Sequence, residues 1–289
     1  MIKVEIVCDS SAPSGIRLTT FVLTYPRFIH AEFMTHRVFS RNASSSRAIP
    51  VAKQIQMVLD NPAVPLAFST NQKGMQGGAA LTGPEEYEAK KAWVEAMYLA
   101  VDQAKKLADL NVHKQYANRL LEPFSHITVV CTATDWDNFF ALRCHEAAQP
   151  EIHALADCMY DLYVNNSPRE LLCGQWHLPF ITQEDELDTH SELGCGETRE
   201  ELISALLKRS VARCARVSYL NHDGTSSTLA QDLELYGRLV GAAPIHASPA
   251  EHQALALADS THRSGNFRGW IQYRKTLENE NVTEFKKNP

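Results

Sequence analysis

The sequence has little positive charge and no long apolar run. Lys and Arg number 28 against 34 Asp and Glu, a formal net charge of -6, so the chain lacks the cationic surplus that draws proteins onto nucleic acid or anionic membranes. The acid-free basic segment 34–59 contains one Phe and no Trp or Tyr, so basic and aromatic residues are not interleaved as they are on a nucleic-acid-binding surface. No apolar run approaches the roughly 20 residues of a membrane-spanning helix, and the first residues lack the layout of a signal peptide. We therefore expect a cytoplasmic protein with no nucleic-acid or membrane partner.

Recognisable metal and nucleotide motifs are also missing. The seven cysteines form no C-x-x-C pair, and the twelve histidines never show H-E-x-x-H spacing, so no metal is expected. In a reducing compartment the cysteines should be free thiols or small core residues. Gly194-Cys195-Gly196 lacks the third glycine of a dinucleotide fingerprint, and no G-x-x-x-x-G-K-[ST] loop is present. These absences exclude Rossmann and P-loop folds.

The pattern of apolar residues indicates one compact α+β domain over residues 1–289 with a large helical share. Alternation and β-branched residues predict strands near 2–6, 17–25 and 126–134, the first two paired across a turn at 10–15. Helical spacing predicts helices at 28–37, 50–59, 84–110, 137–144, 150–165, 199–216 and 227–240. The 84–110 stripe, which contains Trp93 and Met97, should be core or a subunit interface.

Composition and capping signals divide the rest of the chain. The Gly-rich segment 68–83 should be an inserted loop, and 41–47 should also be a loop. Hydroxyl and Glu residues three positions apart predict capping boxes at 82–85, 167–170 and 198–201. The acidic segment 183–201 should be a solvated surface, and the polar tail 280–289 should be frayed.

The segment Met34–Leu59 has four cations and no acid within a chain of net charge -6. It contains Arg37, Arg41, Arg47 and Lys53, together with several hydroxyls. Guanidinium forks, hydroxyls and loop N–H groups are the donors that bind phosphate, so an anionic ligand is expected here. A solvated basic loop would give the same composition, and composition alone does not separate the two.

The segment His246–His252 reads as a helix start. Ser248 would be the cap, Pro249 the first helical residue and Glu251 the acid of the first turn. An ordinary helix cap explains this pattern without any ligand. A helix N-terminus also presents unpaired N–H groups to an anion, so a cap and a phosphate site are compatible.

The segment from Asn138 to Ile152 carries a third polar constellation. Asn138 and Arg143 enclose the apolar insert Phe-Phe-Ala-Leu on an expected helix. An arginine held against apolar surroundings needs a partner, and a nucleobase carbonyl or a carboxylate would serve. The neighbouring Cys144 is better explained as a buried thiol than as a nucleophile, because adjacent side chains on a helix point apart.

Together these segments resemble the flavin-dependent thymidylate synthases. That family's signature is R-H-R followed after seven residues by Ser, often as R-H-R-x-x-S-x-N-E-x-S-x-R, and here Thr35-His36-Arg37 precedes Ser45, with Ser40, Asn42 and Arg47 in place. Its N-F-x-x-L-R and A-Q-x-E-I motifs match residues 138–152. Its A-R-V-S and H-x-S/T-P-x-E-H motifs match Ala215–Ser218 and His246–His252, which come last here and not first.

The resemblance implies the α+β fold of the thymidylate synthase complementing proteins, with an antiparallel sheet and a circularly permuted motif order. It implies FAD as the cofactor, methylenetetrahydrofolate and NADPH as co-substrates, and a pyrimidine deoxynucleotide as substrate. The reaction would be transfer of a one-carbon unit to carbon 5, most simply dUMP to dTMP. It further implies a homotetramer whose subunits share active sites.

The resemblance also assigns roles to residues. Arg143 would be the catalytic residue, favouring the anionic form of the uracil ring while binding the substrate. The cofactor would be bound by His36, Arg37, Asn138, Ser218, His246 and Ser248. The substrate would be bound by Glu32, Ser45, Arg47, Arg119 and Arg143, and Asn118 is the alternative to its neighbour Arg119.

The sequence departs from the family pattern at three positions of these motifs. Thr35 replaces the first Arg, Ala43 replaces a Glu, and Ala147 replaces a His. The family's Gln three places before the signature is Glu32. Two alternatives therefore stay open: a related modifier such as a dUMP hydroxymethylase or a dCMP methylase, and a catalytically inactive nucleotide-binding protein.

Overall fold

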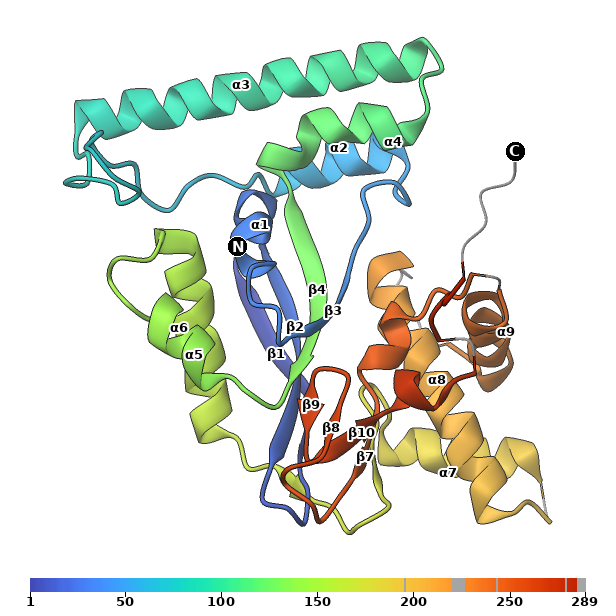
Figure 1. Ribbon diagram of the computed structural model, residues 1–289. Helices are drawn as coiled ribbons and strands as arrows, with labels where there is room; N and C mark the ends of the chain where they lie inside the picture. The colour runs from blue at the N-terminus through green and yellow to red at the C-terminus, as the bar shows by residue number, and fades with distance from the viewer. Residues whose placement is uncertain (195, 220–226, 243, 279, 285–289) are drawn as a thin grey trace.

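A five-stranded sheet with the order β3-β4-β2-β1-β5 lies at the centre of the protein (Figure 1). The computed structural model describes residues 1–194, 196–219, 227–242, 244–278 and 280–284, except for the side chains of 217–219. The strands are β1 (Lys3–Ser11), β2 (Arg17–Pro26), β3 (Ser40–Ala43), β4 (His126–Ala133) and β5 (Arg169–Glu170). Neighbouring strands are antiparallel, except for β1 and β5, which pair in parallel.

Two smaller sheets lie beside the central one. One has the order β10-β7-β6 and joins β10 (Trp270–Gln272), β7 (Ala254–Ala256) and β6 (Trp176–His177). The other pairs β8 (Arg263–Ser264) with β9 (Phe267–Arg268). Both belong to the C-terminal half of the chain, which carries the last two sequence motifs.

Helices form layers on both sides of the central sheet and a third group at one end of it (Figure 1). One side carries α5 (Asp137–Arg143) and α6 (Pro150–Asn165), and the other carries α7 (Gln183–Leu193), α8 (Arg199–Tyr219) and α9 (Leu229–Val240). The end group contains α2 (Val51–Asp60), α3 (Pro84–Asp109) and α4 (Lys114–Ala117). The shorter helical turns are η1 (Arg27–Ile29), α1 (His30–Phe33), η2 (Asn118–Phe124), η3 (Ser248–Glu251) and η4 (Tyr273–Thr276).

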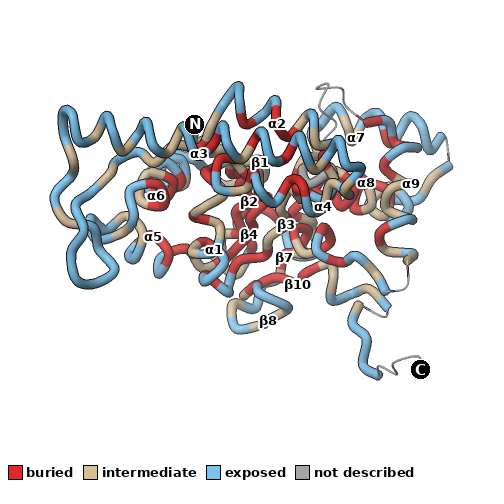
Figure 2. Tube along the Cα trace, turned by 90° about the horizontal axis from the view of Figure 1, so that it is seen from above, coloured by how far each residue is buried: buried red, intermediate tan, exposed pale blue. Residues whose placement is uncertain are grey.

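The main apolar core lies between the sheet and α5 and α6. Phe21, Leu23 and Tyr25 alternate along β2 and are fully buried on this side, as the two-residue repeat of a strand requires. Phe21 meets Trp136 edge to face with ring centroids 5.1 Å apart. Figure 2 shows the buried sheet strands enclosed by helices with exposed outer faces. The expected strands and the α+β class are confirmed.

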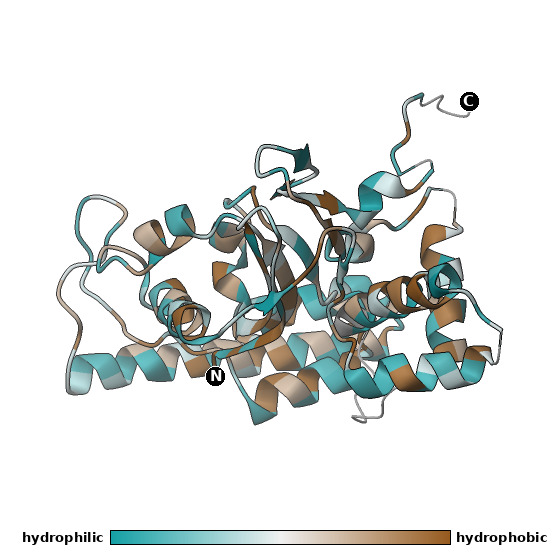
Figure 3. Cartoon of the chain, turned by 90° about the horizontal axis from the view of Figure 1, so that it is seen from below, coloured by the Kyte–Doolittle hydropathy of each residue, from teal (hydrophilic) through white to brown (hydrophobic). Residues whose placement is uncertain are grey.

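The long helix α3 packs on α2 and η2 through one apolar stripe. Met97, Val101 and Ala104 are buried against Val58 and Leu121. Apolar and polar residues alternate along the helix in Figure 3, as the sequence predicts for an amphipathic helix. The Gly-rich segment that precedes α3 is a loop, folded back on itself by a bridge between Ser69 and Ala80.

Several local predictions are wrong. Residues 40–43 form strand β3 and not a loop, and 28–37 forms only the short turns η1 and α1. Residues 169–170 form β5, so there is no capping box at 167–170. The helix at 84 begins after Gly83, whose φ is +64°, with no side-chain cap from Thr82. The box at 198–201 does form.

The acidic segment lies at the surface as expected, mostly as a helix, and the C-terminal tail is more ordered than expected. Residues 183–193 form α7, where Thr182 and Asp185 make a capping box and Asp185 pairs with Arg213. Glu280, placed in the expected frayed tail, bonds Arg274 and Lys275 at 2.9 and 2.7 Å. Residues 285–289 of that tail lie outside the described residues.

Candidate active site

His36 and Arg143 meet although they are 107 residues apart in the chain. His36 lies in the turn after α1, and Arg143 is the last residue of α5. The Arg143 Nε donates a hydrogen bond of 3.0 Å to the His36 Nε2. The Arg143 Nη1 lies 3.6 Å from the Glu32 Oε2. Three residues predicted for the site are therefore brought together.

The His36 ring is neutral at physiological pH. The ring is buried, and it meets Phe139 edge to face at 4.9 Å. Burial, with the positive charges of Arg143 and Arg41 adding to it, lowers the pKa of His36 to about 4. A neutral ring has one bare nitrogen, and here Nε2 must be that nitrogen because it accepts from Arg143. His36 therefore holds the guanidinium by its lone pair.

The turn that carries His36 is fixed by backbone contacts. The Arg41 Nη1 donates to the carbonyls of Phe33 and His36 at 3.2 and 3.1 Å. The Thr35 hydroxyl donates to the Glu32 carbonyl at 2.6 Å. Arg41 therefore has a structural role, while Arg37 is exposed. Within the residues described, Arg37 takes part in no ion pair, so its charge is open to a ligand.

Asn42 of β3 joins the signature segment to both C-terminal motifs. Its Nδ2 donates to the Cys214 carbonyl at 2.8 Å, immediately before the A-R-V-S motif. The Ser248 Oγ lies 3.3 Å from the Asn42 Oδ1. These pairs are separated by 172 and 206 residues in the chain, so three motifs converge on one strand. If the motifs build one site although their order along the chain is permuted, they must meet in space in this way.

The segment 246–252 does not have the predicted form. It contains η3, a four-residue 3-10 turn whose N-cap is Ala247, and Ser248 makes no capping hydrogen bond. The helix N-terminus proposed as a phosphate site is therefore absent, because a single short turn has neither the aligned dipole nor the row of free N–H groups. His246 and Ser248 are exposed. The side chain of Ser218 lies outside the described residues.

The end of the signature segment is held by Glu122 and Asn118. The Ser46 Oγ donates to the Glu122 carboxylate at 2.8 Å, and Arg119 donates to the same carboxylate at 3.0 Å. Asn118 is fully buried, and its Nδ2 donates to the carbonyls of Ser46 and Ile49. Asn118 therefore has a structural role, and the half-exposed Arg119 is the member of this pair that a ligand can reach.

The remaining predicted residues lie at the surface. Ser45 is half-buried and its Oγ accepts from the Arg47 backbone N–H at 3.3 Å. Arg47 is exposed, and among the described residues it forms no ion pair. Asn138 is exposed on α5, five residues before Arg143, and the structure shows no contact that brings it to Asn42 or Ser248.

Sequence reasoning missed a group of polar residues behind β3. The Gln272 Nε2 donates to the Ser40 Oγ at 3.0 Å and to the Glu251 carbonyl at 3.1 Å. The Arg274 Nη1 donates to the Glu251 carboxylate at 2.5 Å. Gln272, Arg274 and Glu251 line a polar cavity of about 310 Å³. No local pattern could have identified this group, because Gln272 ends strand β10 and Arg274 lies in the following turn η4.

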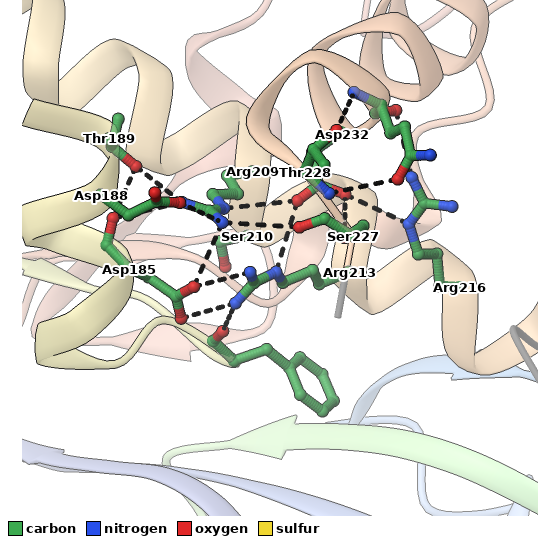
Figure 4. Close-up of polar contacts among 12 residues, drawn as sticks. Asp185, Asp188, Thr189, Arg209, Ser210, Arg213, Arg216, Ser227, Thr228 and Asp232 are labelled. Atoms are coloured by element: carbon green, nitrogen blue, oxygen red, sulfur yellow. Dashed lines mark hydrogen bonds and ion pairs between the residues drawn. The ribbon is translucent and has the colours of Figure 1, made fainter. Parts of the chain in front are cut away.

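An ionic network fixes the helices that carry the A-R-V-S motif (Figure 4). Three arginines of α8 face the fully buried Asp232 and the partly buried Asp185. Arg209, Arg213 and Arg216 each lie within 3.5 Å of Asp232, and Arg213 also pairs with Asp185. Burial by itself would raise the pKa of Asp185, but hydrogen bonds from Arg213 and Thr182 outweigh it and lower the pKa to about 2. The network therefore clamps α7 and α9 to α8.

No helix among the described residues has the length and apolar character needed to cross a membrane. The same residues contain no group of three His, Cys, Asp or Glu side chains arranged to hold a metal ion. Six cysteines are free, Cys8, Cys131, Cys144, Cys158, Cys173 and Cys214, and Cys195 lies outside the described residues.

A match to a protein-family model shows to which family this chain is related. The sequence model of the thymidylate synthase complementing proteins matches residues 16–169, more than half of the chain. The chain belongs to this family. The matched range contains the signature segment and the Asn138–Ile152 motif, and the two remaining motifs follow it. The resemblance to this family drawn from the sequence is confirmed.

Two solved structures are similar to this chain, both of the UMP/dUMP methylase PolB from Streptomyces cacaoi, bound with 5-Br UMP and with 5-Br dUMP. Each is 18% identical to this chain and covers 57% of it. The covered share of the solved chain is 89% and 90%, with TM-scores of 0.48 and 0.47. No match was found among curated proteins.

Proposed function

We propose that this member of the thymidylate synthase complementing protein family uses FAD to transfer a one-carbon unit from methylenetetrahydrofolate to carbon 5 of a pyrimidine deoxynucleotide, most simply dUMP to dTMP. The observation that carries the proposal is the cluster of Glu32, His36 and Arg143. It places a guanidinium, held through two of its nitrogens, next to His36, whose neighbour in the chain, Arg37, is an exposed cation.

Arg143 would supply the electrostatic part of the reaction. Its Nε and Nη1 are directed to His36 and Glu32, and its side chain keeps about a fifth of its exposure. A positive charge against the pyrimidine ring stabilises negative charge on the base, which raises the electron density at carbon 5. Because His36 stays neutral, it accepts from the guanidinium without adding a competing positive charge.

The donors around β3 fit an anionic dinucleotide cofactor. Arg37 and Arg47 are exposed and are not neutralised by a carboxylate in the part of the chain described, and Ser248 and His246 are exposed on the segment next to Asn42. FAD, when bound, supplies hydride chemistry that no side chain can perform, with NADPH as the source of reducing equivalents. The chain's own residues bind and orient it. We assign Arg37, His246 and Ser248 to the cofactor, together with Asn138 and Ser218.

The nucleotide would be bound at the other end of the signature segment. Ser45 and Arg47 offer a hydroxyl and a guanidinium to its phosphate, and Arg119 is adjacent through the Ser46–Glu122 contact. Glu32 would contact the base, because its carboxylate lies beside Arg143. We further propose a cytoplasmic homotetramer, with the long helix α3 as an interface.

One incubation tests the proposal. The purified chain is mixed with FAD, NADPH and methylenetetrahydrofolate, dUMP and dCMP are offered in turn, and the product is weighed by mass spectrometry. We expect a flavin absorbance spectrum and a dUMP product heavier by one methyl group. A hydroxymethyl product or a methylated dCMP would identify one of the related modifiers. Nucleotide binding in calorimetry without any turnover would show that the protein has lost catalysis.

A further inference from the structure

A row of small polar side chains crosses the central sheet beneath the C-terminal half of the chain. The strand registers place Cys8 opposite Thr20, Thr20 opposite Thr132, and Thr132 opposite Ser40. Residues directly opposite each other project to the same face of a sheet. The side chains of Thr20, Thr132 and Ser40 belong to residues with no exposed surface. Buried hydroxyls require hydrogen-bond partners, so the layer that covers this row must supply them.

Two histidines from that layer bind the row at separate points. His177 of β6 places its Nε2 2.8 Å from the Thr20 Oγ1. His252, which follows η3, places its Nδ1 2.8 Å from the Thr132 Oγ1. The two threonine hydroxyls are themselves 2.8 Å apart. Three consecutive hydrogen bonds therefore connect the two rings. Beyond them, the His177 Nδ1 lies 2.9 Å from the Ser10 Oγ.

Both rings are neutral. They are fully buried, and burial lowers the pKa of His177 and of His252 to about 3, with the mutual repulsion of the two rings as a smaller cause at His252. Each ring therefore carries one proton, on either Nδ1 or Nε2. The Cys8 Sγ, 3.4 Å from the His177 Nδ1, remains a thiol because burial raises its pKa to about 11.

Counting protons along the three hydrogen bonds leaves two arrangements. If His177 donates from Nε2, then Thr20 must donate to Thr132, and Thr132 must donate to a bare Nδ1 of His252, which then carries its proton on Nε2. If the His177 Nε2 is bare, the three hydrogen bonds run the other way: the His252 Nδ1 donates to Thr132, Thr132 donates to Thr20, and Thr20 donates to His177. Both rings then carry the proton on Nδ1. Each hydroxyl has one proton to donate. If both rings donate, one buried hydroxyl proton has no acceptor among the described residues, and if neither ring donates, one of the three hydrogen bonds has no proton.

We propose that Thr20 and Thr132 form a relay that couples the two rings, so that His177 and His252 always hold their proton on the same ring nitrogen. The free end of the relay is the His252 Nε2, which is buried and, among the residues described, has no hydrogen-bond partner. His177 is thus a positioning residue for His252. Through the two threonine hydroxyls it determines whether the His252 Nε2 is a donor or an acceptor.

This end of the relay adjoins the candidate site. His252 follows Glu251, which bonds Arg274, and the same short segment carries Ser248 beside Asn42. Ser40, the last member of the polar row, accepts from Gln272 at the edge of the cavity. The coupling does not depend on the proposed function, because it follows from the three hydrogen bonds between the two rings and the two hydroxyls.

Nitrogen-15 NMR of the full chain tests the relay. The protein is labelled at histidine, and the ring nitrogens are observed in long-range proton–nitrogen spectra at pH 7, which separate the two neutral tautomers and the charged ring. His177→Gln and His252→Gln spectra assign the two rings. We expect both to be neutral and to show the same tautomer. Opposite tautomers, or a charged ring, in the unaltered chain would overturn the proposal.

Variants of Thr20, with a control at Thr24, test whether the hydroxyls couple the two rings. Thr20→Val removes the central hydroxyl while its size is kept, and we expect the His252 signals to shift although its own partner, Thr132, is unchanged. Thr24→Val is the control. The Thr24 hydroxyl lies on the same strand and bonds Thr128 at 3.1 Å, and it bonds neither histidine, so its removal should leave both rings unchanged. Thr20→Ser, which keeps the hydroxyl, should preserve the wild-type tautomers. Unshifted His252 signals in Thr20→Val, or different tautomers in the two rings of Thr20→Ser, would contradict the relay.

Discussion

The Arg143 Nε donates to the bare Nε2 of His36 across 3.0 Å, and this single hydrogen bond joins the last residue of α5 to the signature turn. A cation next to a histidine usually implies repulsion, but burial keeps the ring neutral and converts it into an acceptor. The guanidinium is thereby oriented by a lone pair on one side and by the Glu32 carboxylate on the other. An arginine oriented in this way needs no rearrangement when a ligand binds.

Replacement of Arg143 should lower turnover strongly and leave cofactor binding intact. Arg143→Ala removes the charge proposed to act on the pyrimidine, and loss of such a preorganised group costs about 10² to 10³ in kcat. Arg143→Lys keeps the charge but cannot contact His36 and Glu32 simultaneously through a planar fork, so an intermediate activity is expected. Turnover of dUMP and flavin absorbance, measured on the same samples, check both expectations.

The control for this pair is Arg238→Ala on α9. Arg238 is exposed and pairs with Glu234 at 3.9 Å on the same helix. Such an exposed ion pair contributes little to stability, and this one lies outside the site. Wild-type activity in Arg143→Ala would remove Arg143 from the mechanism, whereas an equal loss in Arg238→Ala would show that the assay responds to charge in general.

Local pattern predicts most of the main elements. The strands at 17–25 and 126–134 and the helix at 84–110 agree with β2, β4 and α3 within about two residues, because each has a complete apolar repeat of its own. Strand β3 was missed because residues 40–43 have no such repeat. They become a strand by pairing with β4, which is far away in the sequence. The same reason explains β5, which forms only by its parallel pairing with β1.

For the candidate site too, the sequence predicts some residues and not others. Motif spacing identified His36, Arg143 and Ser248, because residue identity is what a motif records. It did not identify Asn42 as the junction of three segments, or Gln272 and Arg274 behind it, because those roles arise from contacts over roughly 20 to 230 residues of chain. The helix cap expected at Ser248 failed because a 3-10 turn satisfies the same composition.

Asn42→Asp should weaken the junction between the signature segment and the C-terminal motifs. The change replaces the Nδ2 donor by a carboxylate oxygen facing the Cys214 carbonyl, so a hydrogen bond becomes a repulsion in a buried place. We expect a loss of about 1–3 kcal/mol in the free energy of unfolding and a weaker affinity for FAD. Urea denaturation and flavin titration measure the two effects.

Asn165→Asp is the matched control for that change. The Asn165 Nδ2 also donates to a backbone carbonyl, that of Asp161 at 2.8 Å, but at an exposed position near the end of α6. Water can replace the lost donor there, so we expect a change within about 0.5 kcal/mol and an unchanged FAD affinity. Equal effects of the two substitutions would mean that the Asn42 contacts do not hold the site together.

Asp232→Asn should strongly destabilise the helices α7, α8 and α9. Asp232 is fully buried and faces three arginines, of which Arg209 is itself almost completely buried (Figure 4). Removal of this charge takes the most buried carboxylate from the network, so that Arg209 and Arg213 keep Asp185 and Asp188 as partners. Breaking a buried ion pair costs about 3–5 kcal/mol in other proteins. Asp188→Asn, at a half-exposed member of the network, should cost about 1 kcal/mol or less. Urea unfolding of both variants checks the difference, and equal costs would contradict it.

Mild acid should destabilise the protein through its buried histidines. Burial is the first cause that lowers the pKa of five of them: to about 4 for His30, His36 and His126, and to about 3 for His177 and His252. The unfolded chain takes up these protons as the pH falls through about 6.5, while the folded chain does not take them up until about pH 4. The folded state therefore loses stability as the pH falls from 6.5 to 4. Each fully buried ring contributes a slope of at most about 1.4 kcal/mol per pH unit.

Urea midpoints at pH 7, 6 and 5 measure this slope. His252→Gln should flatten it by one histidine's share, because glutamine takes up no proton in either state. His113→Gln, at an exposed histidine whose Nδ1 accepts only from a backbone N–H, should leave the slope unchanged. A free energy of unfolding that stays constant between pH 6.5 and 5, or equal effects of His252→Gln and His113→Gln on the slope, would contradict the lowered pKa values of the buried rings.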